Sequence, residues 1–271
     1  MEKTLYVIPT PIGNLDDISF RAIKTIEECQ ILFSEDTRVT MQLMNHLNLK
    51  KTIFSNHKDN EHKNHKKIED LLEKNSIVGL ISDRGTPLIS DPGFPLINIA
   101  ISKGYEIICL PGPTAFVPAL VSSGISAEKF VFYGFLSNKK SEKKKELEKL
   151  KEEEFTIIFY ESPHRIEETL KIMYDIFGDR KVSVSKEISK KYENTYRSTL
   201  STITSVIENY KGEFVIVVEG NKDKVDFSNI SYTEHVDIYL KQNIDLMTSI
   251  KKVAKERGVS KSAVYKEVHR K

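Results

Sequence analysis

The chain has 271 residues, of which 39% are hydrophobic and 30% are charged, and its formal net charge at pH 7 is +2. This is enough apolar material for one large domain, or for two smaller domains with cores of their own. No apolar run reaches the ~18 residues of a membrane span, and the amino terminus lacks a signal-peptide pattern. We therefore expect a soluble, cytoplasmic protein.

The first 115 residues alternate predicted strands with predicted helices. The strands are short apolar runs at 5–8, 31–33, 52–55, 77–81 and 106–110. Helical spacing of apolar residues predicts helices between them, at 19–28, 43–47, 68–72 and 94–101. This alternation predicts βαβ units and a mainly parallel sheet, in an N-terminal α/β domain covering residues 1–115.

A long polar loop follows the predicted strand at 77–81 and reads SDRGTPLISDPG from Ser82 to Gly93. Its glycines let the backbone approach a ligand, and its prolines make the loop stiff. In open α/β sheets, ligands bind outside the carboxyl ends of the strands. The loop is therefore the predicted binding site. The alternative, an ordinary strand–loop–helix connection, is disfavoured because such connections usually have two to six residues.

The second half predicts a second α/β domain, covering residues 116–220, with some antiparallel strands. Its strands are expected at 130–133, 156–160, 182–185 and 214–218, with turn and strand at 190–199 and a helix at 200–210. Residues 139–154 contain seven Lys and six Glu. They are expected to form a solvated helix, and a lid over a polyanion is the alternative.

The sequence Glu161-Ser162-Pro163-His164-Arg165 follows directly after the strand expected at 156–160. Pro163 is predicted at the first turn of a helix that Ser162 caps, so that His164 and Arg165 lie at the rim beside an acid. A structural cap with a salt bridge is the alternative.

Residues 221–271 are expected to form a basic helical tail. Within it, Ser260 is predicted to cap a helix at 261–268 that follows a helix at 246–256. This hairpin resembles a helix-turn-helix in outline. Lys251 to Lys271 include eight Lys or Arg and two Glu, which points to a polyanionic partner, although a hairpin packed on its own protein is the alternative.

Metal and nucleotide signatures are missing. Cys29 and Cys109 lie far apart in apolar segments and are expected to be free, buried thiols. His57, His62 and His65 have the polar neighbours of an exposed loop, so we predict no metal site. No G-x-G-x-x-G follows the first strand and no G-x-x-x-x-G-K-[ST] occurs, so ordinary dinucleotide and P-loop sites are unsupported.

Seven motifs, in order, resemble the ribosomal RNA small-subunit methyltransferase I family. They are PTPIGN, SEDTR, SD-x-GTPLISDPG, LPGPTA, FYESPHR, KEISK and VVEG, spread over residues 4–220. The resemblance implies the tetrapyrrole methylase fold, with two α/β/α domains, the cofactor cleft between them, and usually a homodimer. It also implies transfer of a methyl group from S-adenosylmethionine to the 2′-oxygen of a cytidine in 16S ribosomal RNA of the small ribosomal subunit.

Two other functions remain open. One is a methylase of the same fold acting on a tetrapyrrole, another small molecule or a protein side chain. The other is a non-catalytic RNA-binding protein that keeps the fold.

The family's cofactor contacts correspond to residues of the polar loop and of the PGPT and FYESPHR segments. These are Asp83, Gly85, Thr86, Pro87, Ile89, Ser90, Thr114, Ala115 and Tyr160. Two positions depart from the family pattern: Arg84 replaces a usual alanine, and Asp59 replaces a usual histidine.

Methyl transfer to a ribose hydroxyl needs precise positioning and help in removing a proton. The candidates for the base, or for the group that orients it, are Glu161, Lys186, Glu187 and His164. Ion pairing would explain Lys186 and Glu187 without catalysis. The candidates for contacting the RNA are Asn14, Arg38, Arg165, Arg197 and the basic end at 251–271.

Overall fold

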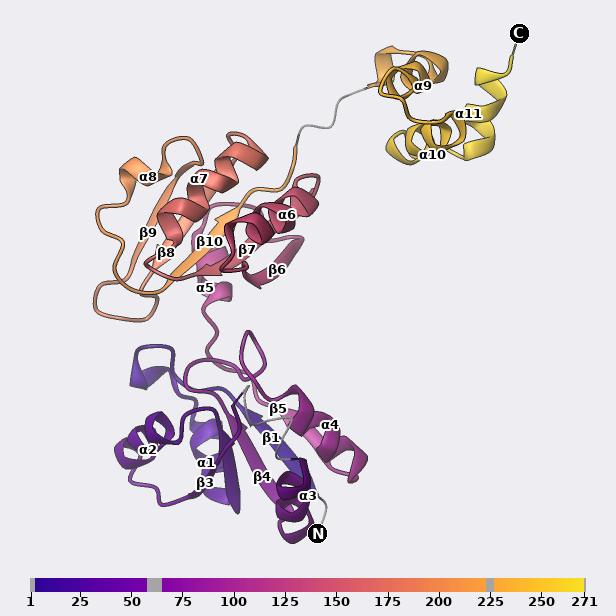
Figure 1. Cartoon of the computed structure of the whole chain (residues 1–271). Coiled ribbons are helices and arrows are strands. Elements are labelled where there is room, and N and C mark those ends of the chain that lie inside the picture. Colours follow the sequence, from indigo (N-terminus) through magenta and orange to yellow (C-terminus); the bar gives the residue numbers. More distant parts are fainter. Residues whose placement is uncertain (1–2, 58–64, 223–226, 271) are drawn as a thin grey trace. The chain divides into compact units, whose positions relative to one another are not determined.

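The chain forms two compact units in a computed structural model, Met1–Asn221 and Lys222–Lys271 (Figure 1). The structure describes residues 3–57, 65–222 and 227–270. Asp59 and His62 lie outside these residues. In the described part of the chain, no helix is long and apolar enough to cross a membrane, and no group of three or more His, Cys, Asp or Glu could hold a metal ion.

The first unit contains two five-stranded sheets. The first sheet is entirely parallel, as predicted, and its strand order is β3-β2-β4-β1-β5. Its strands are β1 (Thr4–Ile8), β2 (Ile31–Ser34), β3 (Thr52–Ser55), β4 (Ile77–Ile81) and β5 (Glu106–Cys109). The central strand β4 is therefore the one that leads into the polar loop.

Helices cover both faces of this sheet. On one face, α1 (Phe20–Glu28) and α2 (Thr37–His46) share a core cluster with Ile8 and Leu32. On the other face, α3 (His65–Lys74) and α4 (Phe94–Ser102) share a cluster with Leu5, Phe33 and Leu80. Burial on both faces explains why the central strands β1, β2 and β4 contain apolar runs rather than alternating apolar and polar residues.

The loops after β1 and β4 are tied to each other. Thr10 and Gly85 exchange two backbone hydrogen bonds, with N···O distances of 2.9 and 3.0 Å. The Thr10 hydroxyl donates to the Ser82 carbonyl, and the Ser82 hydroxyl donates to the Gly85 carbonyl. Gly85 has a φ of 82°, which is in the left-handed region that favours glycine. These bonds fix the polar loop against its neighbour.

The second sheet is mixed, with the order β6-β7-β10-β8-β9. Strands β6 and β7 pair in parallel, and the other pairs are antiparallel. The strands are β6 (Phe130–Phe135), β7 (Thr156–Glu161), β8 (Lys181–Lys186), β9 (Asn194–Thr199) and β10 (Phe214–Val218). The antiparallel strands predicted in the second half of the chain are therefore present.

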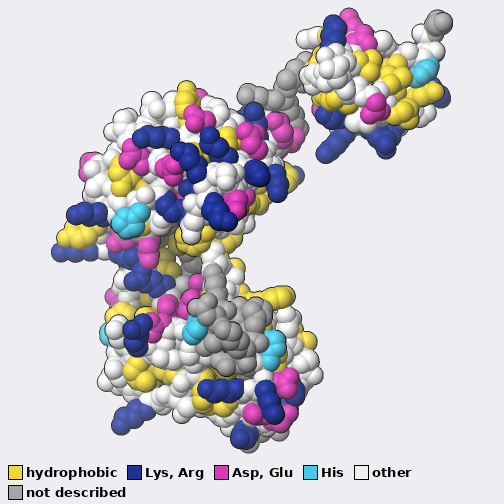
Figure 2. All heavy atoms as spheres, viewed as in Figure 1, with side chains coloured by type: hydrophobic (Ala, Val, Ile, Leu, Met, Phe, Trp, Pro, Cys, Tyr) yellow, Lys and Arg dark blue, Asp and Glu magenta, His cyan; other side chains and the backbone are white. Residues whose placement is uncertain are grey.

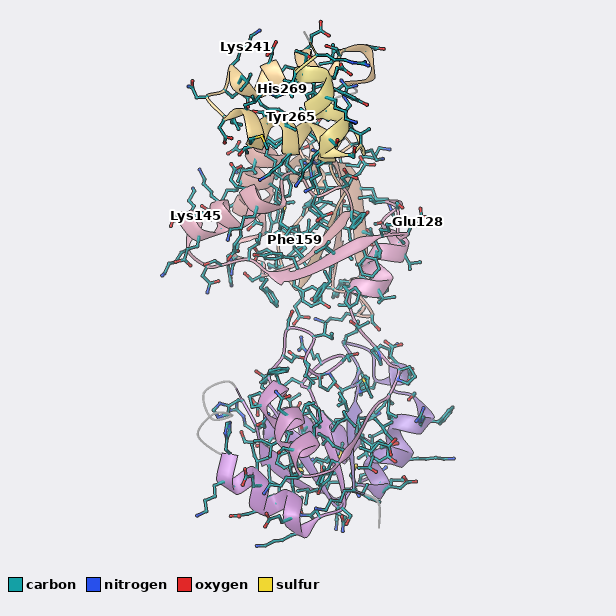
Figure 3. All side chains as sticks on the ribbon, turned by 90° about the vertical axis from the view of Figure 1, so that its right-hand side faces the viewer. Glu128, Lys145, Phe159, Lys241, Tyr265 and His269 are labelled. Carbon is teal, nitrogen blue, oxygen red and sulfur yellow. The ribbon has the colours of Figure 1, made fainter. Side chains whose placement is uncertain are left out.

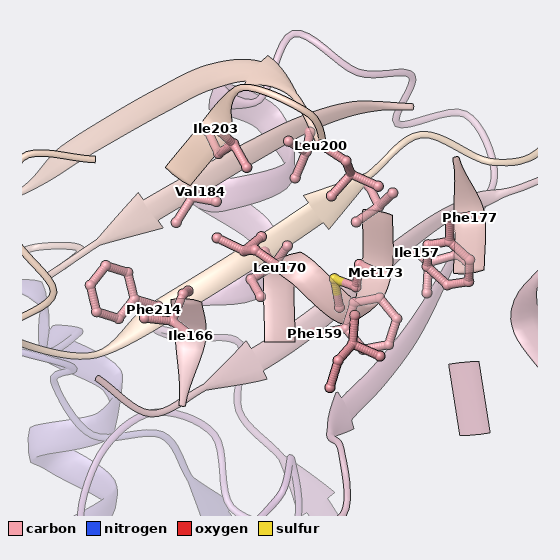
Figure 4. Close-up of a cluster of buried hydrophobic side chains, with 14 of the residues drawn as sticks. Ile157, Phe159, Ile166, Leu170, Met173, Phe177, Val184, Leu200, Ile203 and Phe214 are labelled. Carbon is pink, nitrogen blue, oxygen red and sulfur yellow. The ribbon is translucent and has the colours of Figure 1, made fainter. Parts of the chain in front are cut away.

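A large apolar cluster covers one face of the second sheet (Figure 4). It joins strand residues such as Ile157 and Phe159 to Leu170 and Met173 of α7 (Ile166–Phe177). The helices α6 (Lys140–Leu150) and α8 (Ile203–Val206) contribute to the same cluster. The opposite face is covered by α5 (Phe116–Ser122), which packs on Ile158 and Val217.

The C-terminal unit is a three-helix bundle with a small core. Helices α9 (Tyr232–Leu240), α10 (Leu246–Glu256) and α11 (Lys261–Val268) bury Val236, Ile250, Val253 and Val264 together. The predicted α10, α11 and Ser260 cap are confirmed. The first helix was not predicted, although Ser231 and Glu234 form a capping box that marks its start. Lys and Arg side chains are visible on this unit's surface in Figure 2.

Three local predictions were wrong. Cys109 is exposed because β5 is an edge strand, whereas Cys29 is buried as expected. The helix predicted at 200–210 spans Ile203–Val206, and the chain becomes extended at Ile207. The helix after β7 starts at Ile166, so Pro163 lies in a turn before it. Ser162 does not cap that helix with its side chain.

Candidate active site

A pocket of about 300 Å³ lies between loops of the first sheet and loops of the second. This volume is at the lower end of the range for small-molecule sites. Its wall from the first half includes Ile12, Thr86 and Ile89, and its wall from the second half includes Phe135 and Tyr160. The pocket is therefore bounded largely by apolar side chains, with a few polar groups among them.

Most of the cofactor residues predicted from the family resemblance line this pocket. They are Gly85, Thr86, Ile89, Ser90, Thr114, Ala115 and Tyr160. Asp83 and Pro87 are not among its lining residues. The Asp83 carboxylate turns the other way and accepts a hydrogen bond from the Asp36 backbone N–H at 3.0 Å, so it holds the loop after β2.

The polar loop is held in an uncommon backbone conformation. Leu88 and Ser90 both have a φ of 70°, a left-handed backbone conformation that residues other than Gly, Asn and Asp rarely adopt. The Thr86 hydroxyl donates to the Pro113 carbonyl at 2.9 Å and so ties the loop to the PGPT segment. Strained residues of this kind concentrate at functional sites, because the surrounding structure must hold them in place.

Glu161, at the end of β7, lines the pocket and has a buried carboxylate. Glu161 is 2% exposed, and its Oε1 accepts a hydrogen bond from the Ser162 N–H at 2.8 Å. Its Oε2 accepts from the Thr169 hydroxyl at 2.7 Å. Arg165 lies 3.2 Å from Oε1, and Lys143 lies 3.9 Å from Oε2. Glu161 is therefore fixed by several donors, an arrangement that suits a fixed charge better than a mobile base.

Lys143 is the functional-site residue that the sequence analysis missed. It lies in the charge-rich helix α6, yet it is 1% exposed and donates to the Thr169 hydroxyl at 2.8 Å. Burial lowers the pKa of its ammonium group, while the nearby Glu161 carboxylate acts in the opposite direction. No local signal separates Lys143 from its exposed neighbours, because its burial depends on α7 packing beside α6.

The other three catalytic candidates lie outside the pocket lining. Lys186 is buried and donates to the Asn209 side chain. Glu187 accepts hydrogen bonds from Lys190 and from the Glu213 backbone N–H. Burial alone would raise the pKa of Glu187, but these two bonds and the positive charges of Lys190 and Arg84 together outweigh it and lower the pKa. His164 is exposed on the turn before α7.

The four residues predicted to contact RNA are not brought to one place. Asn14 accepts a hydrogen bond from the Asp16 N–H and lines a shallow groove with Lys190. Arg38 is paired with Asp36, which lowers the pKa of that carboxyl to about 2. The guanidinium of Arg197 donates to a backbone carbonyl at the end of α5.

Arg165, the fourth, is engaged within the fold. Besides its ion pair with Glu161, it donates to the carbonyls of Leu136 and Ser137 and to the Asn138 side chain. It therefore links the end of β7 to the segment between β6 and α6. This arrangement favours a structural role for Arg165.

Comparison with known proteins places the chain in a family. The profile described as "Tetrapyrrole (Corrin/Porphyrin) Methylases" matches residues 4–204. Proteins named ribosomal RNA small subunit methyltransferase I are 42% identical in Bacillus subtilis and 36% identical in Haemophilus influenzae. The alignments cover 98% and 96% of this chain, and 94% of each relative. The chain belongs to the tetrapyrrole methylases. Within them it is similar over nearly its full length to the small-subunit methyltransferase I proteins.

Solved structures agree with this fold. The methyltransferase CobJ superimposes with a TM-score of 0.59 at 16% identity, covering 80% of this chain and 94% of the other. Uroporphyrin-III C-methyltransferase from Thermus thermophilus, in complex with S-adenosyl homocysteine, gives 0.54 at 15% identity, with 79% and 96% covered. The two-sheet architecture is thus that of the tetrapyrrole methylases.

The methyl donor of this family is S-adenosylmethionine, and the pocket residues fit it. The donor combines apolar surface with polar groups and a positive sulfonium. The pocket offers apolar walls and the hydroxyl-bearing residues Thr86, Ser90 and Tyr160. Gly85 lets two loops of the wall pack closely, because a Cβ there would lie only 3.2 Å from the Ile12 side chain. When bound, the donor would supply an electrophilic methyl group at this pocket.

Proposed function

We propose that this protein transfers a methyl group from S-adenosylmethionine to the 2′-oxygen of a cytidine in small-subunit (16S) ribosomal RNA. The observation that carries the proposal is the match of nearly the whole chain, at 36–42% identity, to proteins named ribosomal RNA small subunit methyltransferase I. It is supported by the pocket, whose walls contain most of the predicted cofactor residues.

The role of the protein's own residues is mainly to position the reactants. Thr86, Ser90 and Tyr160 line the pocket with polar atoms on a stiff scaffold. Holding two reactants near attack distance can lower a barrier by about 7–11 kcal/mol. The buried network around Glu161 fixes the end of β7, which forms part of the pocket wall.

The substrate strand would be bound through its phosphates by Lys and Arg outside the pocket. The C-terminal unit is a candidate for part of this contact, since its helices α10 and α11 carry the basic end of the chain.

We also expect a homodimer. Exposed apolar side chains on α5 and β6, such as Val121 and Phe130, could contribute to its interface.

The proposal is tested with purified protein, S-adenosylmethionine carrying a labelled methyl group, and small ribosomal subunits from cells that lack this gene. We expect label in the RNA, which mass mapping would locate on the ribose of one cytidine. Label on uroporphyrinogen instead would favour a tetrapyrrole substrate. Failure to bind S-adenosylmethionine in calorimetry would favour a non-catalytic RNA-binding protein.

A further inference from the structure

Two basic side chains from different loops share one carboxylate at the edge of the pocket. Arg84, in the loop after β4, pairs through Nη1 with Oε1 of Glu213. Lys190, in the loop between β8 and β9, lies 2.8 Å from Oε2 of Glu213 and 2.9 Å from Oε1 of Glu187. We call these four residues, Arg84, Glu187, Lys190 and Glu213, the mouth cluster.

The two cations lie along a path that leads out of the pocket. Arg84 lines the pocket and also a neighbouring groove that includes Gln42 and His46. Lys190 lines this groove and a further one with Asn14 and Lys191. A strand with one ribose in the pocket would have to leave through such an opening, and its phosphates would then pass these cations.

The backbone around Lys190 fixes the position of its side chain at the grooves. A Cβ on Gly13 would lie 2.3 Å from Cγ of Lys190, so Gly13 leaves room for the lysine stem. Glu187 and Ser189 have φ values of 53° and 66°, in the left-handed region that is strained for these residues. The Ser189 N–H donates to the Glu193 carboxylate at 2.6 Å, which helps to hold this conformation. Strain kept in a half-buried surface loop points to a function for the side chains that the loop presents.

The ion pair that joins the two halves of the cluster is weak enough to exchange. The side chains of Arg84 and Glu213 are 55% and 61% exposed. Exposed ion pairs contribute about 0–1 kcal/mol to stability, so another anion can replace the carboxylate at little cost. A phosphate suits this exchange, because a guanidinium can donate two parallel hydrogen bonds to it.

We propose that Arg84 and Lys190 bind backbone phosphates of the RNA strand that is methylated, and that Glu213 occupies their phosphate positions until the RNA arrives. This inference rests on the proposed function and adds a substrate site to it. It also assigns a role to Arg84.

The test measures steady-state methylation of the RNA at a series of salt concentrations. For Arg84→Gln and Lys190→Gln we expect KM for the RNA to rise by roughly 3- to 10-fold, and the slope of the salt dependence to flatten by about 0.7 for each phosphate that is no longer neutralised. For Lys190→Gln, which lies outside the lining of the pocket, binding of S-adenosyl homocysteine, followed by calorimetry, should stay within about twofold of the wild-type value. Gly13→Ala, which displaces the Lys190 stem, should resemble Lys190→Gln.

Lys103→Gln is the matched control. Lys103 also pairs with two carboxylates, those of Glu69 and Glu73, but it lies just after α4, away from the pocket and its grooves. Its replacement should leave KM and the salt dependence unchanged.

Glu213→Gln distinguishes a binding site from a structural bridge. If Glu213 competes with phosphate, this variant should lower KM for the RNA about two- to threefold. A rise in KM similar to that of Arg84→Gln would mean that the mouth cluster only joins the loop after β4 to the segment before β10. This result would overturn the inference. An unchanged salt dependence in the Arg84 and Lys190 variants would also overturn the inference, provided that the wild-type protein methylates the RNA. A wild-type protein that does not methylate the RNA would instead overturn the proposed function, and this site with it.

Discussion

Lys143 and Lys145 lie on the same helix and illustrate how different two lysines can be. Lys143 is buried against Glu161 and Thr169, whereas Lys145 points outward from α6 (Figure 3). A buried charge is tolerated where partners surround it, and removing one partner leaves the other uncompensated. At the scale of single residues, the role of a side chain depends more on the groups around it than on the kind of amino acid.

Replacing Lys143 with Met should therefore destabilise the fold. The change keeps the length of the side chain but leaves the Glu161 carboxylate without one of its two cations. We expect the free energy of unfolding to fall by about 2 kcal/mol, or Tm by roughly 4–8 °C for a unit of this size, in thermal unfolding followed by circular dichroism. Lys145→Met is the control and should change stability by less than about 0.5 kcal/mol. Equal effects of the two substitutions would contradict the buried network.

Cys29 gives a prediction for alkaline pH. Burial raises the pKa of its thiol from 9.0 to about 12. Above pH 9 the thiol ionises in the unfolded chain but stays neutral in the fold, so the unfolded state binds fewer protons and stability falls as pH rises toward 12. The slope from this group approaches about 1.4 kcal/mol per pH unit. Urea unfolding of the wild type and of Cys29→Ala at pH 8 to 10.5 measures this contribution as the difference between the two slopes of unfolding free energy against pH. The inference is wrong if both proteins lose stability with the same slope.

At the scale of elements, the sequence predicted strands and long loops well. The central strands β1, β2 and β4 are covered on both faces, so each contains an apolar run that is visible locally. The polar loop after β4 could be recognised because it directly follows such an apolar run. Local patterns also predicted α10, α11 and the Ser260 cap.

What the sequence could not predict depends on contacts between distant segments. The pairing of Arg84 with Glu213 joins residues 129 positions apart, and nothing near either one marks it. Lys143 is buried because α7 packs beside α6. The helix α9 is different: its capping box at Ser231 was present in the sequence and was overlooked.

The cap of α11 allows a test at this scale. The Ser260 side chain accepts a hydrogen bond from the Ala263 N–H. Ser260→Ala should destabilise the helix by about 1 kcal/mol, and so speed amide hydrogen exchange in α10 and α11 about fivefold. Ser262→Ala, an exposed position within the same helix, is the control and should not speed exchange. Equal exchange in the two variants would show that the cap contributes nothing.

At the scale of the whole molecule, the chain combines a unit that contains the pocket with a small basic unit that has its own core. The core of the C-terminal unit draws on all three helices, since Val236 of α9 packs with Ile250 of α10 and Val264 of α11. A deletion that begins within this unit would therefore expose an apolar face. The boundary between the two compact units, after Asn221, is the appropriate place to cut.

Removing residues 222–271 should weaken RNA binding without affecting the cofactor pocket, because the residues that line the pocket all precede the cut. The slope of the salt dependence of RNA binding should flatten by about 0.7 for each phosphate that the truncated protein no longer neutralises, as measured by filter binding over roughly 50 to 200 mM salt. Affinity for S-adenosyl homocysteine should be retained, which provides the internal control for folding. A truncated protein with the full salt dependence would exclude the C-terminal unit from the RNA interface. The phosphates would then have to be bound by the first unit, where Arg84 and Lys190 are the proposed pair.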